Sequence, residues 1–227
     1  MKINNSQIVD LSHRLLRRQE NFPYDANATP DSRFDPDNWY IECVAKLGAH
    51  AGTHVEVPYH HELGGEDCMT FPVENLIGEC TVIDCLGKQP GEEITLSDVK
   101  KAADRLEDGD IVFLYTGYDK LFRKPNWQPY PPLSREALDW LLQHHPKVIG
   151  TDASGVELTD GYDEAGRMHE LYGEPIHVTC FQHHVAIVES LTHLEAIAQE
   201  RTTVFILSLP MQRMDASPCR IVAVRGI

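Results

Sequence analysis

The apolar residues of this chain gather in short runs rich in Val, Ile and Leu, separated by stretches of polar, Gly and Pro residues. Runs of that kind are typical of β-strands. They predict strands at residues 8–12, 39–47, 81–85, 110–115, 148–152, 185–189, 204–209 and 220–224. The run at 110–115 is apolar after its first residue, which indicates a strand buried on both faces of a sheet.

Capping residues predict helices between some of these strands. Thr95 and Asp98 match a capping box, so a helix should run from there to about residue 106. Ser134 can cap a second helix over 135–144. A short helix is expected at 192–195, where Thr192 supplies the cap. Loops are predicted where polar residues, Gly and Pro dominate, at residues 20–38, 117–132 and 153–176.

The alternation of strands with a few short helices predicts an α/β or α+β fold with a mixed central sheet. A chain of 227 residues can bury a substantial core as one domain, so we expect a single domain spanning residues 1–227. Hydrophobic residues make up 42% of the chain and charged residues 24%, which is ordinary for a globular protein.

The net charge and the absence of targeting signals limit the kinds of molecule with which the protein is expected to interact. The net charge of -15 argues against nucleic acid and anionic membranes, because both are polyanions. The first residues hold no apolar stretch suited to a signal peptide, and no run approaches a membrane span. We therefore expect a cytoplasmic protein that acts on a small-molecule substrate. The six Cys include no Cys-x-x-Cys pair, so we interpret them as reduced, buried or half-buried thiols rather than zinc ligands.

The highest density of candidate metal-binding and proton-transfer residues is in residues 50–60, His-Ala-Gly-Thr-His-Val-Glu-Val-Pro-Tyr-His. His50, His54, Glu56 and His60 carry side chains that bind zinc or manganese, or move protons. The proline disfavours a continuous helix, and a flat strand would spread the first three over roughly 20 Å, too far for one ion. A metal site therefore requires the chain to curl, which its glycine permits. The competing interpretation is a set of unrelated strand and loop histidines.

Further ligands can come from the second half of the chain. A turn of helix after His177, followed by the strand that ends at Glu189, could bring these two side chains together. His183 and His184 are rival ligands, although both sit where a helix should join a strand.

The chain resembles the metal-dependent cyclase/hydrolase family that includes bacterial kynurenine formamidase and isatin hydrolase. That family carries the motif His-x-Gly-Thr-His-x-Asp-x-Pro-x-His, which residues 50–60 match except at Glu56. His177 and Glu189 match the family's second metal-binding pair with the same spacing. Weaker similarities follow in the expected order: Asp10-Leu11-Ser12, Gly109-Asp110-Ile111-Val112 running to Thr116-Gly117, Gly150-Thr151-Asp152, and Ser217-Pro218-x-Arg220.

The resemblance implies a ligand set and a mechanism. A first zinc or manganese ion would be bound by His50, His54 and Glu56. A second ion, when present, would use Glu56 as a bridge, together with His177 and Glu189. His60 would transfer protons; the alternative is a histidine that orients a ligand. The adjacent His61 is expected to be a solvated loop residue.

Glu56 is the one departure from the family motif, where Asp is usual. The extra methylene moves the carboxylate outward by about one C–C bond, yet His177 and Glu189 are both present. We predict that two ions can bind, the second more weakly, with Glu56 contacting at least the first.

The resemblance also implies a swivelling β/β/α arrangement and a homodimer or homotetramer with active sites near subunit contacts. The implied activity is hydrolysis of an amide or cyclic amide C–N bond, as in N-formylkynurenine or isatin. A lactone-cleaving or ring-closing enzyme, a non-catalytic metal-binding protein and a small-molecule-binding protein remain alternatives. Four aromatic residues could hold an aryl substrate or simply pack in core and loops: Phe22, Trp39, Trp127 and Tyr130.

Overall fold

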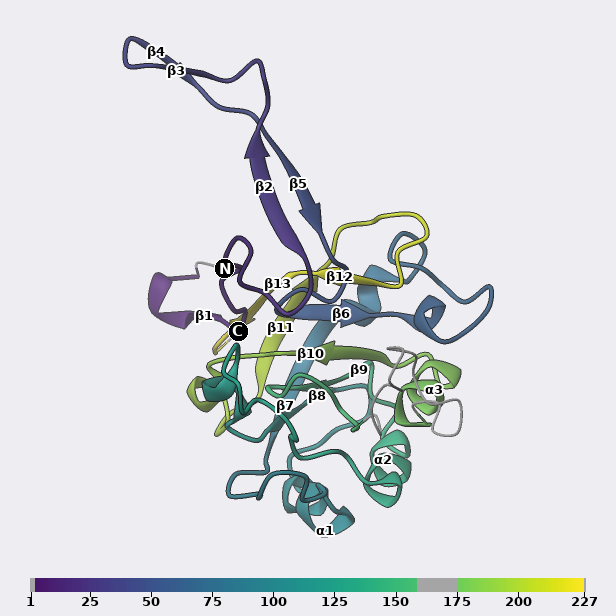
Figure 1. Ribbon diagram of the computed structural model, residues 1–227. Coiled ribbons are helices and arrows are strands. Elements are labelled where there is room, and N and C mark those ends of the chain that lie inside the picture. Colours follow the sequence, from purple (N-terminus) through teal and green to yellow (C-terminus); the bar gives the residue numbers. More distant parts are fainter. Residues whose placement is uncertain (1–2, 159–174, 227) are drawn as a thin grey trace.

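Most of the apolar runs form strands that lie side by side in one sheet of the computed structural model, which describes residues 3–158 and 175–226 (Figure 1). The sheet has nine strands in the order β1-β13-β11-β7-β8-β9-β10-β6-β12. They are β1 (Ile8–Asp10), β6 (His54–Glu56), β7 (Ile77–Asp84), β8 (Ile111–Tyr115), β9 (Val148–Thr151), β10 (Ala186–Glu189), β11 (Thr202–Leu207), β12 (Ala216–Pro218) and β13 (Arg220–Val224). Strands β7 to β10 pair in parallel and the flanking strands pair antiparallel, which confirms the predicted mixed sheet.

Strand β8 is buried over its whole length, as its apolar run predicts. Its side chains alternate between two cores, because successive residues of a strand point to opposite faces. Val112 and Leu114 join a cluster with residues of the three helices, whereas Phe113 joins a second cluster with Val55 and Val57. Helices α1 (Leu96–Val99), α2 (Arg135–Leu142) and α3 (Pro175–Gln182) therefore cover one face of the sheet (Figure 1).

The helix predictions are confirmed in part. Thr95 and Asp98 form the expected capping box, but α1 is shorter than predicted and passes into a single 3-10 turn. Ser134 caps α2 as expected. Helix α3 begins before His177 instead of after it. Thr192 caps no helix, because its hydroxyl donates to Asp119 Oδ2 at 2.9 Å; a 3-10 turn follows at Leu194–Ala196.

The loop predicted at 20–38 is largely a β-ribbon, so that prediction is wrong. Strand β2 (Tyr24–Ala28) pairs antiparallel with β5 (Cys43–Leu47), and β3 (Arg33–Asp35) pairs with β4 (Asn38–Tyr40). The strand predicted at 39–47 is accordingly two strands, and neither enters the central sheet. We call residues 24–47 the arm; it projects away from the sheet (Figure 1). The arm strands are held together by backbone pairing and have no buried apolar face. Their polar sequence therefore predicted a loop where the structure has strands.

The remaining predictions concern loops and thiols. The 117–132 segment contains a 3-10 turn at Tyr118–Leu121, and most of the loop predicted at 153–176 lies outside the described residues. All six cysteines are free thiols; Cys43 is exposed on the arm, contrary to expectation, and the others are buried or half-buried. None of the helices in the described ranges has the length and apolar character needed to span a membrane.

Candidate metal centre

The histidine motif folds as a turn, a short strand and a 3-10 turn. His50 lies in the turn, and Gly52 adopts a left-handed φ of 66° that favours glycine. Strand β6 follows, and a proline then opens the 3-10 turn Pro58–His60. The predicted curl and its glycine bend are both confirmed. Residues 51–58 are all buried, so the segment forms part of the interior rather than a surface loop.

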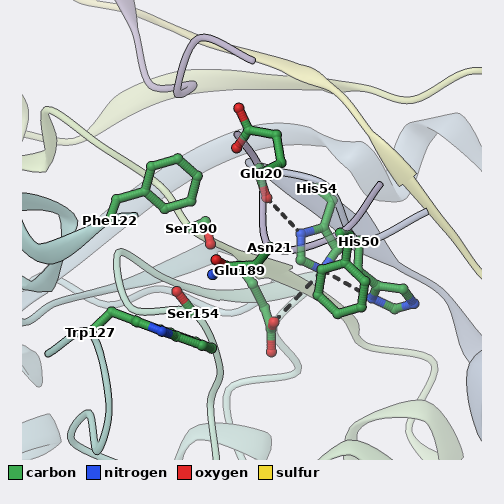
Figure 2. Close-up of a pocket in the computed structure, with 11 residues that line it drawn as sticks. Glu20, Asn21, His50, His54, Phe122, Trp127, Ser154, Glu189 and Ser190 are labelled. Atoms are coloured by element: carbon green, nitrogen blue, oxygen red, sulfur yellow. Dashed lines mark hydrogen bonds and ion pairs between the residues drawn. The ribbon is translucent and has the colours of Figure 1, made fainter. Parts of the chain in front are cut away.

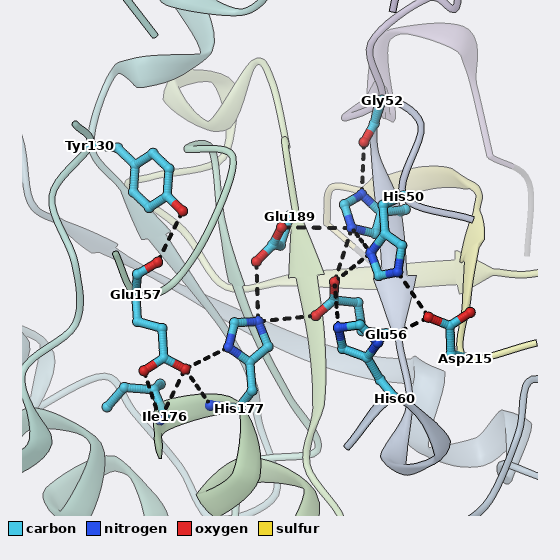
Figure 3. Close-up of polar contacts among 11 residues, drawn as sticks. His50, Gly52, Glu56, His60, Tyr130, Glu157, Ile176, His177, Glu189 and Asp215 are labelled. Carbon is cyan, nitrogen blue, oxygen red and sulfur yellow. Dashed lines mark hydrogen bonds and ion pairs between the residues drawn. The ribbon is translucent and has the colours of Figure 1, made fainter. Parts of the chain in front are cut away.

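The curl brings the first predicted ligand set together (Figure 3). His50 Nδ1 lies 2.7 Å from Glu56 Oε1 and 3.1 Å from His54 Nε2. His54 Nε2 lies 3.2 Å from the same carboxylate oxygen. One ligand atom from each of the three residues lies within 4.8 Å of the other two, which is close enough for all three to bind one metal ion.

Sheet pairing brings the second set to the same place. Strand β10 pairs antiparallel with β6, with Glu189 directly opposite His54. His177 approaches from the first turns of α3, and its Nε2 lies 3.4 Å from Glu189 Oε1 and 3.2 Å from Glu56 Oε2. These three residues form a second cluster that could hold an ion.

Glu56 links the two clusters through its separate oxygens. Oε1 faces His50 and His54, whereas Oε2 faces His177 (Figure 3). The longer side chain at this position therefore reaches both ligand sets. Within the described residues, buried Glu56 Oε2 has no hydrogen-bond partner of good geometry. An acceptor in that state suits a cation.

Each of the three cluster histidines has its second nitrogen fixed by an acceptor. His54 Nδ1 lies 2.8 Å from the Gly52 carbonyl, and His50 Nε2 lies 2.9 Å from Asp215 Oδ2. His177 Nδ1 lies 2.6 Å from Glu157 Oε1. A neutral imidazole that donates from one nitrogen presents a lone pair on the other. The geometry thus directs three lone pairs into the cluster, as in histidines that ligate a metal.

Asp215 and Glu157 were not predicted from the sequence. Glu157 also accepts from the backbone N–H groups of Ile176 and His177, so it holds the start of α3 in place. Asp215 lies two residues before the Ser217-Pro218-x-Arg220 similarity, and that position was the available signal. Glu157 lies after Gly150-Thr151-Asp152 but outside that similarity, and no motif in the surrounding sequence identifies it as a functional residue.

The cluster attracts positive charge. Burial opposes the charge on His50, but its hydrogen bonds to Asp215 and Glu56 outweigh burial and raise the pKa of His50 to about 10. Burial likewise opposes the charge on His177, while Glu157, Glu189 and Glu56 raise its pKa well above the usual range. Burial and the neighbouring Glu56 charge raise the pKa of Glu189. Buried carboxylates that favour cations this strongly fit a divalent metal ion.

His60 lies beside the cluster without belonging to either ligand set. Its Nε2 is 3.9 Å from Glu56 Oε1, and its Nδ1 is 2.9 Å from Asp215 Oδ2. The neighbouring His61 is half-buried and stacks on Phe181 with an interplanar angle of 23°, so the expectation of a solvated residue is wrong. The rival ligands His183 and His184 are exposed and belong to none of the metal-type clusters of the described residues.

A small cleft of about 40 Å³ lies beside the two clusters (Figure 2). Its lining includes the aromatic side chains of Phe22, Phe122 and Trp127 together with His50 and Glu189. Tyr130 is buried and donates to the Glu157 carbonyl at 3.0 Å, while Trp39 is exposed on the arm. Of the four aromatic candidates, two therefore line the cleft.

Comparisons with known proteins identify the family and the fold. A "Kynurenine formamidase" from Erythrobacter litoralis (strain HTCC2594) is 28% identical over 177 residues, which cover 78% of this chain and 73% of that protein. The fold matches the crystal structure of an isatin hydrolase bound to the product analogue thioisatinate, with a TM-score of 0.80 and 20% identity over 97% of this chain and 93% of that one.

A potential metal-dependent hydrolase with cyclase activity also shares the fold, with a TM-score of 0.71 and 22% identity over 97% of this chain and 98% of that one. The Cyclase family model matches residues 9–158, which is more than half of the chain. The chain therefore belongs to the Cyclase family.

Proposed function

We propose that this protein is a metal-dependent hydrolase that cleaves an amide or cyclic amide C–N bond. The observation that carries the proposal is the convergence of His50, His54, Glu56, His177 and Glu189 beside a small aromatic-lined cleft. The kynurenine formamidase relative and the isatin hydrolase fold support this reaction class. The family similarity to a potential metal-dependent hydrolase supports the metal requirement.

Zinc or manganese fits the donor set of imidazole nitrogens and carboxylate oxygens. His50, His54 and Glu56 would hold the first ion, and Glu56, His177 and Glu189 the second. Divalent ions bound there supply Lewis acidity, which polarises a substrate carbonyl and lowers the pKa of water. We expect both sites to fill, the second more weakly, because the second set offers one imidazole nitrogen where the first offers two, and it shares Glu56 with the first.

His60 is assigned to proton transfer. Its Nδ1–H donates to Asp215, so Nε2 carries the lone pair that faces the cluster. From there His60 can accept a proton from the attacking water and return it to the leaving nitrogen. A purely metal-binding protein has no use for such a base, so the non-catalytic alternatives are not favoured.

The aromatic side chains beside the metal ligands suit a flat aryl substrate. Phe122 and Trp127 lie there in Figure 2, Phe22 also lines the cleft, and aromatic surfaces stack on planar rings. N-formylkynurenine, an aryl formamide, and isatin, a lactam, both place a carbonyl beside an aromatic ring. A lactone or a ring-closing reaction would use the same groups.

The full chain, stripped with a chelator and reloaded with zinc or manganese, tests this proposal. Aryl formamides, lactams, lactones and cyclic imides are offered in parallel. Hydrolysis of a formamide or lactam should depend on added metal. His54→Ala should lose most bound metal, whereas the control His184→Ala, a residue outside the clusters, should retain it. Equal turnover by stripped and reloaded protein, or none of any substrate, would refute the assignment.

We also propose that the arm joins two copies of this chain in a homodimer or homotetramer. Apolar side chains are exposed along it, including Phe34 (62%), Trp39 (61%) and Val44 (67%). An isolated two-stranded ribbon is at best marginally stable in water, and the arm has the number of residues that one side of a standard interface needs, roughly 20–30. A second copy packed against the arm would stabilise the ribbon and would bury its apolar side chains. Sedimentation at micromolar concentration tests it, and a monomer would refute it.

Small molecules are the proposed substrates, and neither nucleic acid nor a membrane is proposed as a partner because of the charge of -15. A cytoplasmic location stays a prediction.

A further inference from the structure

Asp215 stands beside the histidine motif because of sheet register. Strand β12 pairs with β6 so that Ala216 lies opposite Glu56. The preceding Asp215 accepts the Val57 N–H through its backbone carbonyl at 3.0 Å. Its carboxylate is thereby held at the level of the ligand cluster, with its side chain about one third exposed at 34%.

A single oxygen of this carboxylate contacts two histidines with different assigned roles. Asp215 Oδ2 lies 2.9 Å from His50 Nε2 and 2.9 Å from His60 Nδ1 (Figure 3). His50 uses its other nitrogen toward Glu56 and His54, whereas His60 directs its other nitrogen toward Glu56 alone. Both rings are therefore held by one acceptor at the nitrogen remote from the cluster.

We propose that Asp215 is a positioning residue that fixes the tautomer and ring orientation of His50 and His60 together. This inference rests on the proposed function, because it takes His50 as a metal ligand and His60 as the proton carrier. Each ring can donate to Asp215 only when its proton sits on the contacting nitrogen. The opposite nitrogens, His50 Nδ1 and His60 Nε2, then both present lone pairs to the cluster.

A third cation site is the competing use of the same groups, since His50, His60 and Asp215 also place ligand atoms close together. Filling it would require His50 to use both nitrogens as ligands, and a neutral imidazole has only one lone-pair nitrogen. His50 Nδ1 already faces the first ligand set. Shared hydrogen bonds to Asp215 are consistent with the first site, whereas a third ion is not.

Two substitutions separate the geometry from the charge. Asp215→Asn keeps an oxygen that can accept from one or both rings, and Asp215→Ala removes it. The matched control is Asp10→Asn, a partly exposed carboxylate that pairs with Arg220 and belongs to none of the metal-type clusters of the described residues. Circular dichroism verifies that each full-length variant folds.

The first readout is zinc binding alone, which does not depend on any substrate. Asp215→Ala should raise the zinc dissociation constant about 10- to 100-fold, the usual effect of removing a carboxylate that orients a ligating histidine. Asp215→Asn should have a smaller effect in the same direction, and Asp10→Asn should bind as the unaltered protein does. Stoichiometry should stay at no more than two ions; a third ion lost with Asp215 would overturn the proposal.

The second readout is turnover of the best amide substrate from the metal-loaded screen. Asp215→Asn should lower kcat about 10- to 100-fold and leave KM within about threefold, because Asp215 faces the histidines and does not line the cleft. In a His60→Ala background at saturating zinc, where His50 is already liganded, Asp215→Asn should lower kcat no further, while the weakened zinc binding persists. This pattern distinguishes action through His60 from a general loosening of the fold.

Unchanged zinc affinity in Asp215→Ala, or kcat losses that multiply in the double variant, would overturn the positioning role. If the unaltered protein hydrolyses no amide, the proposed function fails by itself. The zinc titration then still decides whether Asp215 orients His50.

Discussion

The arm and the histidine motif follow one another along the chain but differ in almost every physical respect. Strands β3, β4 and β5 of the arm are exposed at every residue, whereas residues 51–58 of the motif are buried at every residue. The motif strand β6 lies between β10, which supplies Glu189 to the site, and β12, which Asp215 directly precedes. Among the described residues, the strands of the arm pair only with one another.

This difference shows which surroundings each segment requires. The motif buries carboxylates and imidazoles at a cost in desolvation that only close partners or cations can offset. The arm leaves apolar side chains in water, which only another surface can remove. In the proposed assembly, both ligand sets lie within one copy, whereas a second copy would cover the apolar side chains of the arm.

Removing the carboxylate that the two ligand sets share should have the largest effect on metal binding. Glu56→Gln keeps the side-chain size but loses the charge between both ligand sets. Zinc affinity should fall by more than about 100-fold, beyond the effect of losing a supporting residue, and turnover should fall below detection. Titration calorimetry with zinc measures the first effect. Glu42→Gln on the arm is the control and should bind zinc normally; equal affinity in both variants would contradict the shared-ligand account.

Removing the proposed base should uncouple chemistry from metal binding. His60→Ala should lower kcat about 10²- to 10⁴-fold, the usual contribution of a general acid–base group. Bound zinc should remain, because His60 lies outside both ligand sets. Metal analysis and steady-state kinetics on the same preparation provide the comparison. Parallel loss of metal and turnover would instead make His60 a ligand or its support.

The arm variant should leave the site intact. Phe34→Ser combined with Trp39→Ser removes two of the most exposed aromatic side chains, which form a cross-strand pair. Sedimentation should show dissociation, while zinc affinity stays within about twofold and the free energy of unfolding of one copy changes by no more than about 0.5 kcal/mol, as for surface substitutions. An unchanged assembly would show that the arm tip is no interface.

A half-buried histidine outside the clusters, His13, makes the stability of the fold depend on pH. Burial lowers the pKa of His13 to about 4, against an ordinary value of 6.5, and the nearby Asp119 only partly compensates. The folded state thus prefers neutral His13, and its contribution to stability is complete above pH 6.5 and is lost as pH falls toward 4. The loss should be on the order of 1–2 kcal/mol, allowing for partial solvent access.

His13→Phe is the informative variant, because His13 stacks on Phe122 with centroids 3.9 Å apart and its Nε2 has no hydrogen-bond partner among the described residues. Denaturant unfolding at pH 7 and pH 4 should show a smaller loss of stability in this variant than in the unaltered protein. Identical losses would mean that other groups carry the pH dependence.

The sequence predicted those parts of the structure that are determined by residues close together in the chain. Apolar runs identified most sheet strands, the Ser134 cap located α2, and the motif spacing identified the curl at Gly52. Strands β6 and β12 were missed because each has only three residues and is stabilised by neighbours distant in sequence. The arm was taken partly for a loop because its strands are polar and lack a buried face.

The same limit applies to the site. His50, His54 and Glu56 lie within one segment, and spacing alone indicated them. His177 and Glu189 rested on a resemblance, because their proximity depends on how α3 and β10 pack. Glu157 and Asp215 could not be inferred from local pattern, since each contacts its histidine only through tertiary pairing.

The most direct test of the central claim is anomalous diffraction from crystals of the full chain at saturating zinc. The account predicts one ion between His50 Nδ1, His54 Nε2 and Glu56, and a second, weaker peak between Glu56, His177 and Glu189. Two-metal sites hold their ions about 3.5–4 Å apart. Zinc elsewhere on the chain, or a single ion that leaves both His50 and His54 unliganded, would contradict it.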